Sequence, residues 1–78
     1  MTHTSRNLLK RQAAQIYLGL DRVMANTLEL KAIFDPVHPE LGDALALVME
    51  ASLASQAMMK RFWTETWGQE EPRWESWI

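Results

Sequence analysis

Seventy-eight residues with a mass of 9.0 kDa and no cysteine make one small domain that neither disulfides nor thiolate metal sites can stabilise. Eight basic and 10 acidic residues give a formal net charge of −2, which does not suit a general nucleic-acid binder. Chains this short bury only about 60% of the surface that the unfolded chain exposes, a smaller fraction than larger domains bury, so self-association is the expected source of added stability.

The composition also bears on where the protein works. Apolar residues make up 47% of the chain and charged residues 23%, as in ordinary globular domains. The N-terminal residues lead into no apolar segment typical of a secretory signal. The uncharged stretch 51–59 is far shorter than the ~20 residues that cross a bilayer. We therefore expect a cytoplasmic protein without a membrane segment.

The first predicted element is a long helix over about residues 5–34. Its apolar residues alternate between spacings of four and three, which is a heptad pattern with one polar member, Thr27. Thr4 or Ser5 can cap the start, and Asp35 before Pro36 ends the helix. The pattern consists of Leu9, Ala13, Ile16, Leu20, Val23, Thr27, Leu30 and Phe34.

A short loop, 35–38, separates this helix from a second one of nearly equal length. Pro39 suits the first position of a helix, and Gly68 suits the residue just past its end, so we expect a helix over about 39–67. Two equal helices joined by a few residues form an antiparallel hairpin. The expected fold class is all-α, with an aromatic C-terminal tail at 68–78.

The second helix has an apolar arc of about half its circumference, wider than one neighbouring helix can cover. Small side chains on this arc would let another helix approach closely. We therefore expect two hairpins to form a homodimeric four-helix bundle, since a long exposed apolar groove is rare in monomers. A different protein in the groove, or closure by the tail, are the alternatives. The candidate dimer residues are Ala44, Val48, Ala51, Ser55, Met58 and Phe62.

Four tryptophans fall within the last 16 residues of the chain. Pro72 can begin a single helical turn that places Trp74 and Trp77 on one side. Such a turn either folds back over Trp63 and Trp67 and covers the bundle end, or docks onto a partner. The candidate partner-binding residues are Trp63, Trp67, Trp74, Trp77 and Ile78.

No residue pattern indicates catalysis. The glycines are isolated, no Ser-His-acid arrangement is visible, and His3 and His38 cannot form a metal site without carboxylate help. We expect no cofactor, no metal and no enzymatic activity.

The expected function is a protein–protein interaction module: an adaptor, a chaperone, or a regulator or inhibitor of another protein, of the kind mobile elements encode. The alternative is a dimeric RNA- or DNA-binding regulator that uses the basic part of the first helix. Its basic residues are Arg6, Lys10, Arg11 and Arg22, which point in several directions around the helix. A basic first segment and an acidic middle favour packing opposite ends of neighbouring helices together.

Overall fold

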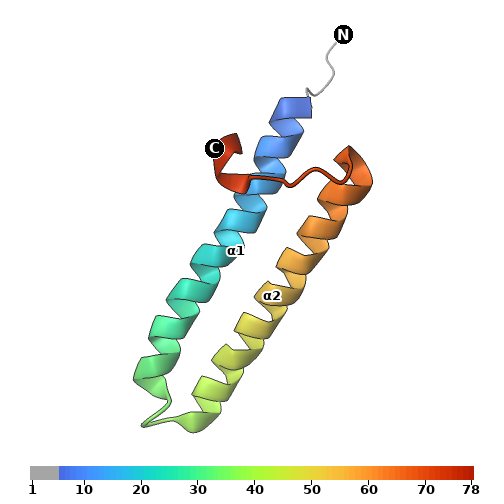
Figure 1. The fold of residues 1–78 in the computed structure, drawn as a ribbon. Coiled ribbons are helices and arrows are strands. Elements are labelled where there is room, and N and C mark those ends of the chain that lie inside the picture. The colour runs from blue at the N-terminus through green and yellow to red at the C-terminus, as the bar shows by residue number, and fades with distance from the viewer. Residues whose placement is uncertain (1–5) are drawn as a thin grey trace.

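The computed structural model describes residues 6–78 and confirms an all-α antiparallel hairpin (Figure 1). Helix α1 spans Arg6–Phe34 and helix α2 spans Pro39–Trp67, with 29 residues each. After α2, the chain crosses to α1 and forms a single 3₁₀ turn, η1, at Trp74–Trp77. No helix in residues 6–78 is long and apolar enough to cross a membrane.

The ends of the helices lie where the local chemistry predicts. Pro39 begins α2, and Gly68 follows its last residue with φ of 105°, while its N–H donates to the Thr64 carbonyl at 2.9 Å. At the end of α1, Lys31 Nζ lies 2.7 Å from Asp35 Oδ2. The predicted start at residue 5 and the caps Thr4 and Ser5 lie outside the described residues.

Polar residues lie in the contact between the two helices, and each has a hydrogen-bond partner. Thr27 Oγ1 donates to the Val23 carbonyl at 2.6 Å, and Ser52 Oγ donates to the Val48 carbonyl at 2.9 Å. Gln56, only 6% exposed, links the two helices by hydrogen bonds of its side chain. Its Nε2 donates to the Tyr17 carbonyl at 3.0 Å and to Asp21 Oδ1 at 2.8 Å. These two bonds fix the height of α2 against α1, because residues 17–21 must lie opposite residue 56.

The buried apolar cluster lies at one end of the hairpin. It consists of Ala13, Ala14, Trp63 and Trp74, and therefore depends on the tail for one of its members. None of the large side chains in residues 6–78 is fully buried. Away from the tail, the residues buried between the two helices are small or polar: Thr27, Gly42, Ser52 and Gln56.

Candidate functional site

The C-terminal tail folds back onto α1, and Trp74 lies flat on Tyr17. The two ring centroids are 4.3 Å apart and the planes differ by 6°. The short chain of Ala14 leaves room for these rings, since Ala14 is completely buried beside them. Trp74 itself is 8% exposed. The tail is thus part of the folded structure, in agreement with the first of the two interpretations above.

Trp63 of α2 is the centre of the aromatic cluster. Its ring meets Trp67 and Trp74 edge-on, with centroids 4.8 and 5.2 Å away, and it lies 6.0 Å from Trp77. Edge-to-face pairs of this kind add to the burial of their apolar surface. We call this cluster, together with Tyr17 and Lys10, the tryptophan end.

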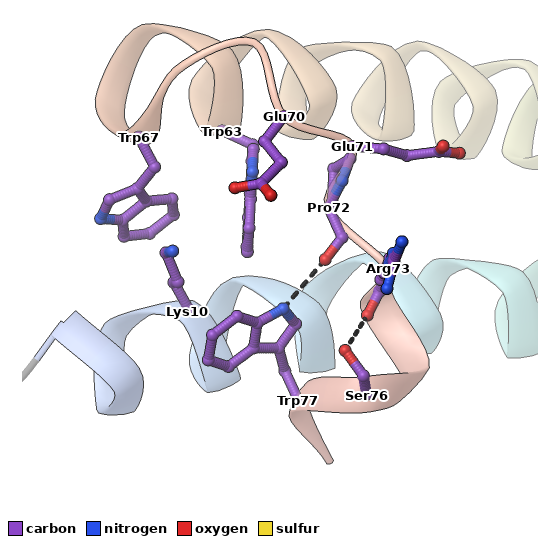
Figure 2. Close-up of a pocket in the computed structure, with 9 residues that line it drawn as sticks. All are labelled: Lys10, Trp63, Trp67, Glu70, Glu71, Pro72, Arg73, Ser76 and Trp77. Atoms are coloured by element: carbon purple, nitrogen blue, oxygen red, sulfur yellow. Dashed lines mark hydrogen bonds between the residues drawn. The ribbon is translucent and has the colours of Figure 1, made fainter.

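Lys10 lies in the middle of the tryptophan end (Figure 2). Its Nζ is 4.9 Å from the ring centroid of Trp77, 5.2 Å from that of Trp63 and 5.7 Å from that of Trp67. A cation at this distance from an indole face is attracted by the electrons of the ring. Lys10 thus joins α1 to both α2 and the tail. Sequence reasoning grouped it with the candidate phosphate contacts and missed this role.

The turn that carries Trp77 is fixed by two further hydrogen bonds. Trp77 Nε1 donates to the Pro72 carbonyl at 2.9 Å, and Ser76 Oγ donates to the Arg73 carbonyl at 2.7 Å. Arg73 has a left-handed backbone with φ of 54°, which reverses the chain just before η1. Beside the turn is a polar hollow of about 280 Å³, lined by the residues of Figure 2.

Each helix carries one line of residues that is buried against the other helix and one line that faces outward. On α1, Ala13 and Thr27 are buried against α2, whereas Leu9, Ile16, Val23 and Leu30 are 41–53% exposed. On α2, Gly42, Ser52, Gln56 and Trp63 face inward. The outward line of α2, all exposed, is Leu41, Ala44, Val48, Ala51, Ser55, Met58 and Phe62.

These two outward lines lie on the same side of the hairpin. Leu9, Ile16 and Phe62 line one almost entirely apolar hollow of about 260 Å³. Towards the loop, Leu30, Leu41 and Ala44 line a second hollow of about 240 Å³. We call the two outward lines together the open face. It includes all six candidate dimer residues, and it adds four residues from the heptad pattern of α1: Leu9, Ile16, Val23 and Leu30.

The tail lies on a different side of α1 from the open face. It stacks on Tyr17, which is one residue and therefore about 100° around the helix from Ile16 of the open face. Leu18 is half-buried against the aromatic cluster on the covered side. Among the candidate partner-binding residues, Trp67 and Trp77 keep part of their surface accessible and Ile78 is exposed.

The basic residues of α1 do not form one surface. Arg6, Arg11 and Arg22 are exposed, but Lys10 is directed into the tryptophan end. Within the described part of the chain, no cluster of three or more His, Asp or Glu side chains could hold a metal ion. Comparison with family models, curated proteins and solved structures found no match to this chain.

Proposed function

We propose that this chain is a non-enzymatic protein-interaction module of the cytoplasm, which works by packing its open face against the helices of another chain. An adaptor, a chaperone, or a regulator or inhibitor of a second protein would all use such a face. The observation that supports the proposal is the row of large apolar side chains, each about half exposed, that runs the length of the hairpin.

The size of this apolar surface is sufficient for a stable contact. Complete burial of a large apolar side chain contributes about 1.5–3 kcal/mol, so covering the half that is still exposed contributes about 1 kcal/mol. The open face holds eight such positions: Leu9, Ile16, Val23, Leu30, Leu41, Val48, Met58 and Phe62. The gross gain from this chain is then about 6–12 kcal/mol, and matching apolar side chains of the partner add a similar amount, so the sum can offset the roughly 4–15 kcal/mol that association costs.

Two matched substitutions on α1 test the proposal. Ile16→Glu places a charge on the open face, and Leu28→Glu places the same charge at a similarly exposed position about 120° around the helix. Ile16 is 53% exposed and Leu28 is 57% exposed, so neither change opens a cavity in the isolated hairpin.

The readout is the set of chains retained by the tagged protein in an extract of its own cells, identified by mass spectrometry. We expect Ile16→Glu to lose the chains that the parent retains, a second copy included, and Leu28→Glu to keep them. The proposal fails if both variants retain the same chains as the parent. Far-UV circular dichroism confirms that both variants remain helical.

A further inference from the structure

We propose that the open face is occupied by a second copy of this chain, in an antiparallel arrangement that sets the loop of each hairpin against the tryptophan end of the other. This inference rests on the proposed function, because it names the occupant of the same face. In this arrangement α1 lies over the partner's α1, and α2 lies over the partner's α2, since the two-fold axis runs across the face at right angles to the helices.

The dimensions of the face match those of a dimer interface. A helix of 29 residues is about 43 Å long, and two packed helices are about 20 Å wide. The outline of the face, length times width, is therefore about 860 Å². This is comparable with the accessible surface of about 800 Å² that each partner buries in a stable complex. A short peptide or a single helix would leave half of the face uncovered.

The outward line of α1 can pair with the same line of a second copy that runs in the opposite direction. Leu9 and Leu30 are equally far from the point between residues 19 and 20, and so are Ile16 and Val23. An antiparallel pair of α1 helices centred there places Leu9 against the partner's Leu30, and Ile16 against the partner's Val23. Every large apolar residue of the line then has an apolar counterpart.

The outward line of α2 has the same symmetry about Ser55. Val48 lies seven residues before Ser55 and Phe62 seven after it, and Ala51 and Met58 are offset by four and three. In an antiparallel pair of α2 helices centred on Ser55, Val48 therefore meets the partner's Phe62. The small Ala51 meets the larger Met58 of the partner. The two centres lie at one height, because Gln56 is hydrogen-bonded to Tyr17 and Asp21 on either side of residue 19. A single two-fold axis can therefore relate α1 to the partner's α1 and α2 to the partner's α2.

Gly19 supports a close approach at this axis. Glycine in the middle of a helix is destabilising relative to alanine, so its presence calls for a reason. A Cβ added to Gly19 would meet nothing within 4 Å in the isolated hairpin, so packing within the protomer supplies none. Gly19 lies three residues after Ile16 and four before Val23, which places it on the side of α1 that meets the partner.

The charges favour the antiparallel arrangement over the parallel one. Residues 20–54, the half of the hairpin with the loop, contain six acidic and two basic residues. The half with the tail, residues 6–19 and 56–78, contains six basic and four acidic residues. An antiparallel pair sets the negative half of each protomer against the positive half of the other, whereas a parallel pair sets like against like. Complementary ends of this kind determine orientation more than affinity.

Disulfide cross-linking tests the arrangement. The chain contains no cysteine, so every disulfide that forms must join the introduced residues. Ser55→Cys is expected to oxidise to a covalent dimer, since the two residues meet at the axis. Leu9→Cys and Leu30→Cys are each expected to stay uncross-linked when alone, because identical residues at these positions lie about 30 Å apart. An equal mixture of the two is expected to form a mixed disulfide, which requires Cα atoms within about 7 Å.

Sedimentation equilibrium of the unmodified protein at micromolar concentration accompanies the cross-linking, with about 18 kDa expected, twice the chain mass of 9.0 kDa. A mixed disulfide between Leu9→Cys and Thr66→Cys would instead show the parallel arrangement and overturn the antiparallel one, while the proposed function stands. A monomer at all concentrations, with no cross-link in any pairing, would overturn the second copy as occupant. The extract experiment with Ile16→Glu and Leu28→Glu then decides separately whether the open face binds another protein.

Discussion

Replacing Trp74 with alanine is expected to cost more stability than any other single change in the tail. Trp74 is 8% exposed, packs flat on Tyr17 and touches Trp63 edge-on. A buried tryptophan removes about 200 Å² from water, which at about 25 cal/mol per Å² gives about 5 kcal/mol as an upper estimate. Measured truncations of buried aromatic residues fall at about 3–5 kcal/mol, so we expect a loss in that range.

Such a loss is large for a domain of this size. One kcal/mol shifts the melting temperature of a domain of 60–100 residues by about 4–8 °C, so Trp74→Ala should melt at least about 12 °C lower. Thermal unfolding followed by far-UV circular dichroism measures this shift, at equal protein concentration for each variant because assembly also raises stability. Ile78→Ala is the matched control in the same tail, since Ile78 is 64% exposed and should change stability by less than about 0.5 kcal/mol.

A melting temperature of Trp74→Ala within a few degrees of the parent would refute the packing argument. Truncation of the chain after Gly68 also tests whether the tail stabilises the fold. A structural tail predicts a clear loss of stability, because Trp63 loses its cover. A tail used only for docking predicts unchanged melting and the loss of a bound partner.

Three further changes follow from individual contacts. Lys10→Met should lower the free energy of unfolding by about 0.5–2 kcal/mol, measured by thermal unfolding, because the contacts of the ammonium group with three indole rings are lost. Arg6→Met, at the same end of α1, is the control and should leave the stability unchanged. Gln56→Leu should cost about 1–2 kcal/mol, since two hydrogen bonds between the helices are lost, whereas Gln15→Leu on the exposed surface should not. Gly42→Ala should change stability by less than about 1 kcal/mol, because its Cβ displaces the exposed Asp35 carboxylate from Lys31 and this loss offsets the gain in helix propensity. Gly19→Ala displaces nothing and should raise hairpin stability by up to about 1 kcal/mol at dilutions where the protein is monomeric; a lower melting temperature there would contradict this.

The ends of the helices could be predicted because they depend on local chemistry. Pro36 and Pro39 exclude a continuous helix through the loop, and Gly68 provides the positive φ that the chain needs after Trp67. These effects act within one helical turn, so no knowledge of the neighbouring helix is required. The predicted bounds 39–67 and the end at residue 34 therefore agree with the structure.

The division of the heptad pattern could not be predicted. Periodicity shows which residues are apolar, but it does not show which of two neighbouring helices each residue contacts. Thr27 is buried while Leu30 is exposed, against the order of their hydrophobicity, because Thr27 points at α2 and its hydroxyl bonds to the Val23 carbonyl. The rotation of α1 about its own axis is set by contacts with α2, such as the hydrogen bonds of Gln56.

The position of Lys10 is a long-range effect of the same kind. It is separated by more than 50 residues from every indole ring that surrounds it. Counting charges along α1 assigns such a lysine to the solvent-exposed surface. The signal that could have found it is the pair Ala13–Ala14, one turn further along α1, because two small buried residues leave room for the large rings of Trp63 and Trp74.

The position of the tail also bears on the proposed dimer. A two-helix layer has two apolar flanks, and a hairpin with both flanks open would stack copy upon copy into an open-ended array. Trp74 and Trp77 cover the flank of Tyr17 and Leu18 at one end of the layer, whereas Leu28, about 20° around α1 from Tyr17, stays exposed beyond the tail. In the proposed dimer, the two open faces cover each other and the assembly closes after two copies. The covered tryptophan end would then oppose further stacking on the other flank, so the tail would favour a closed dimer over a longer array.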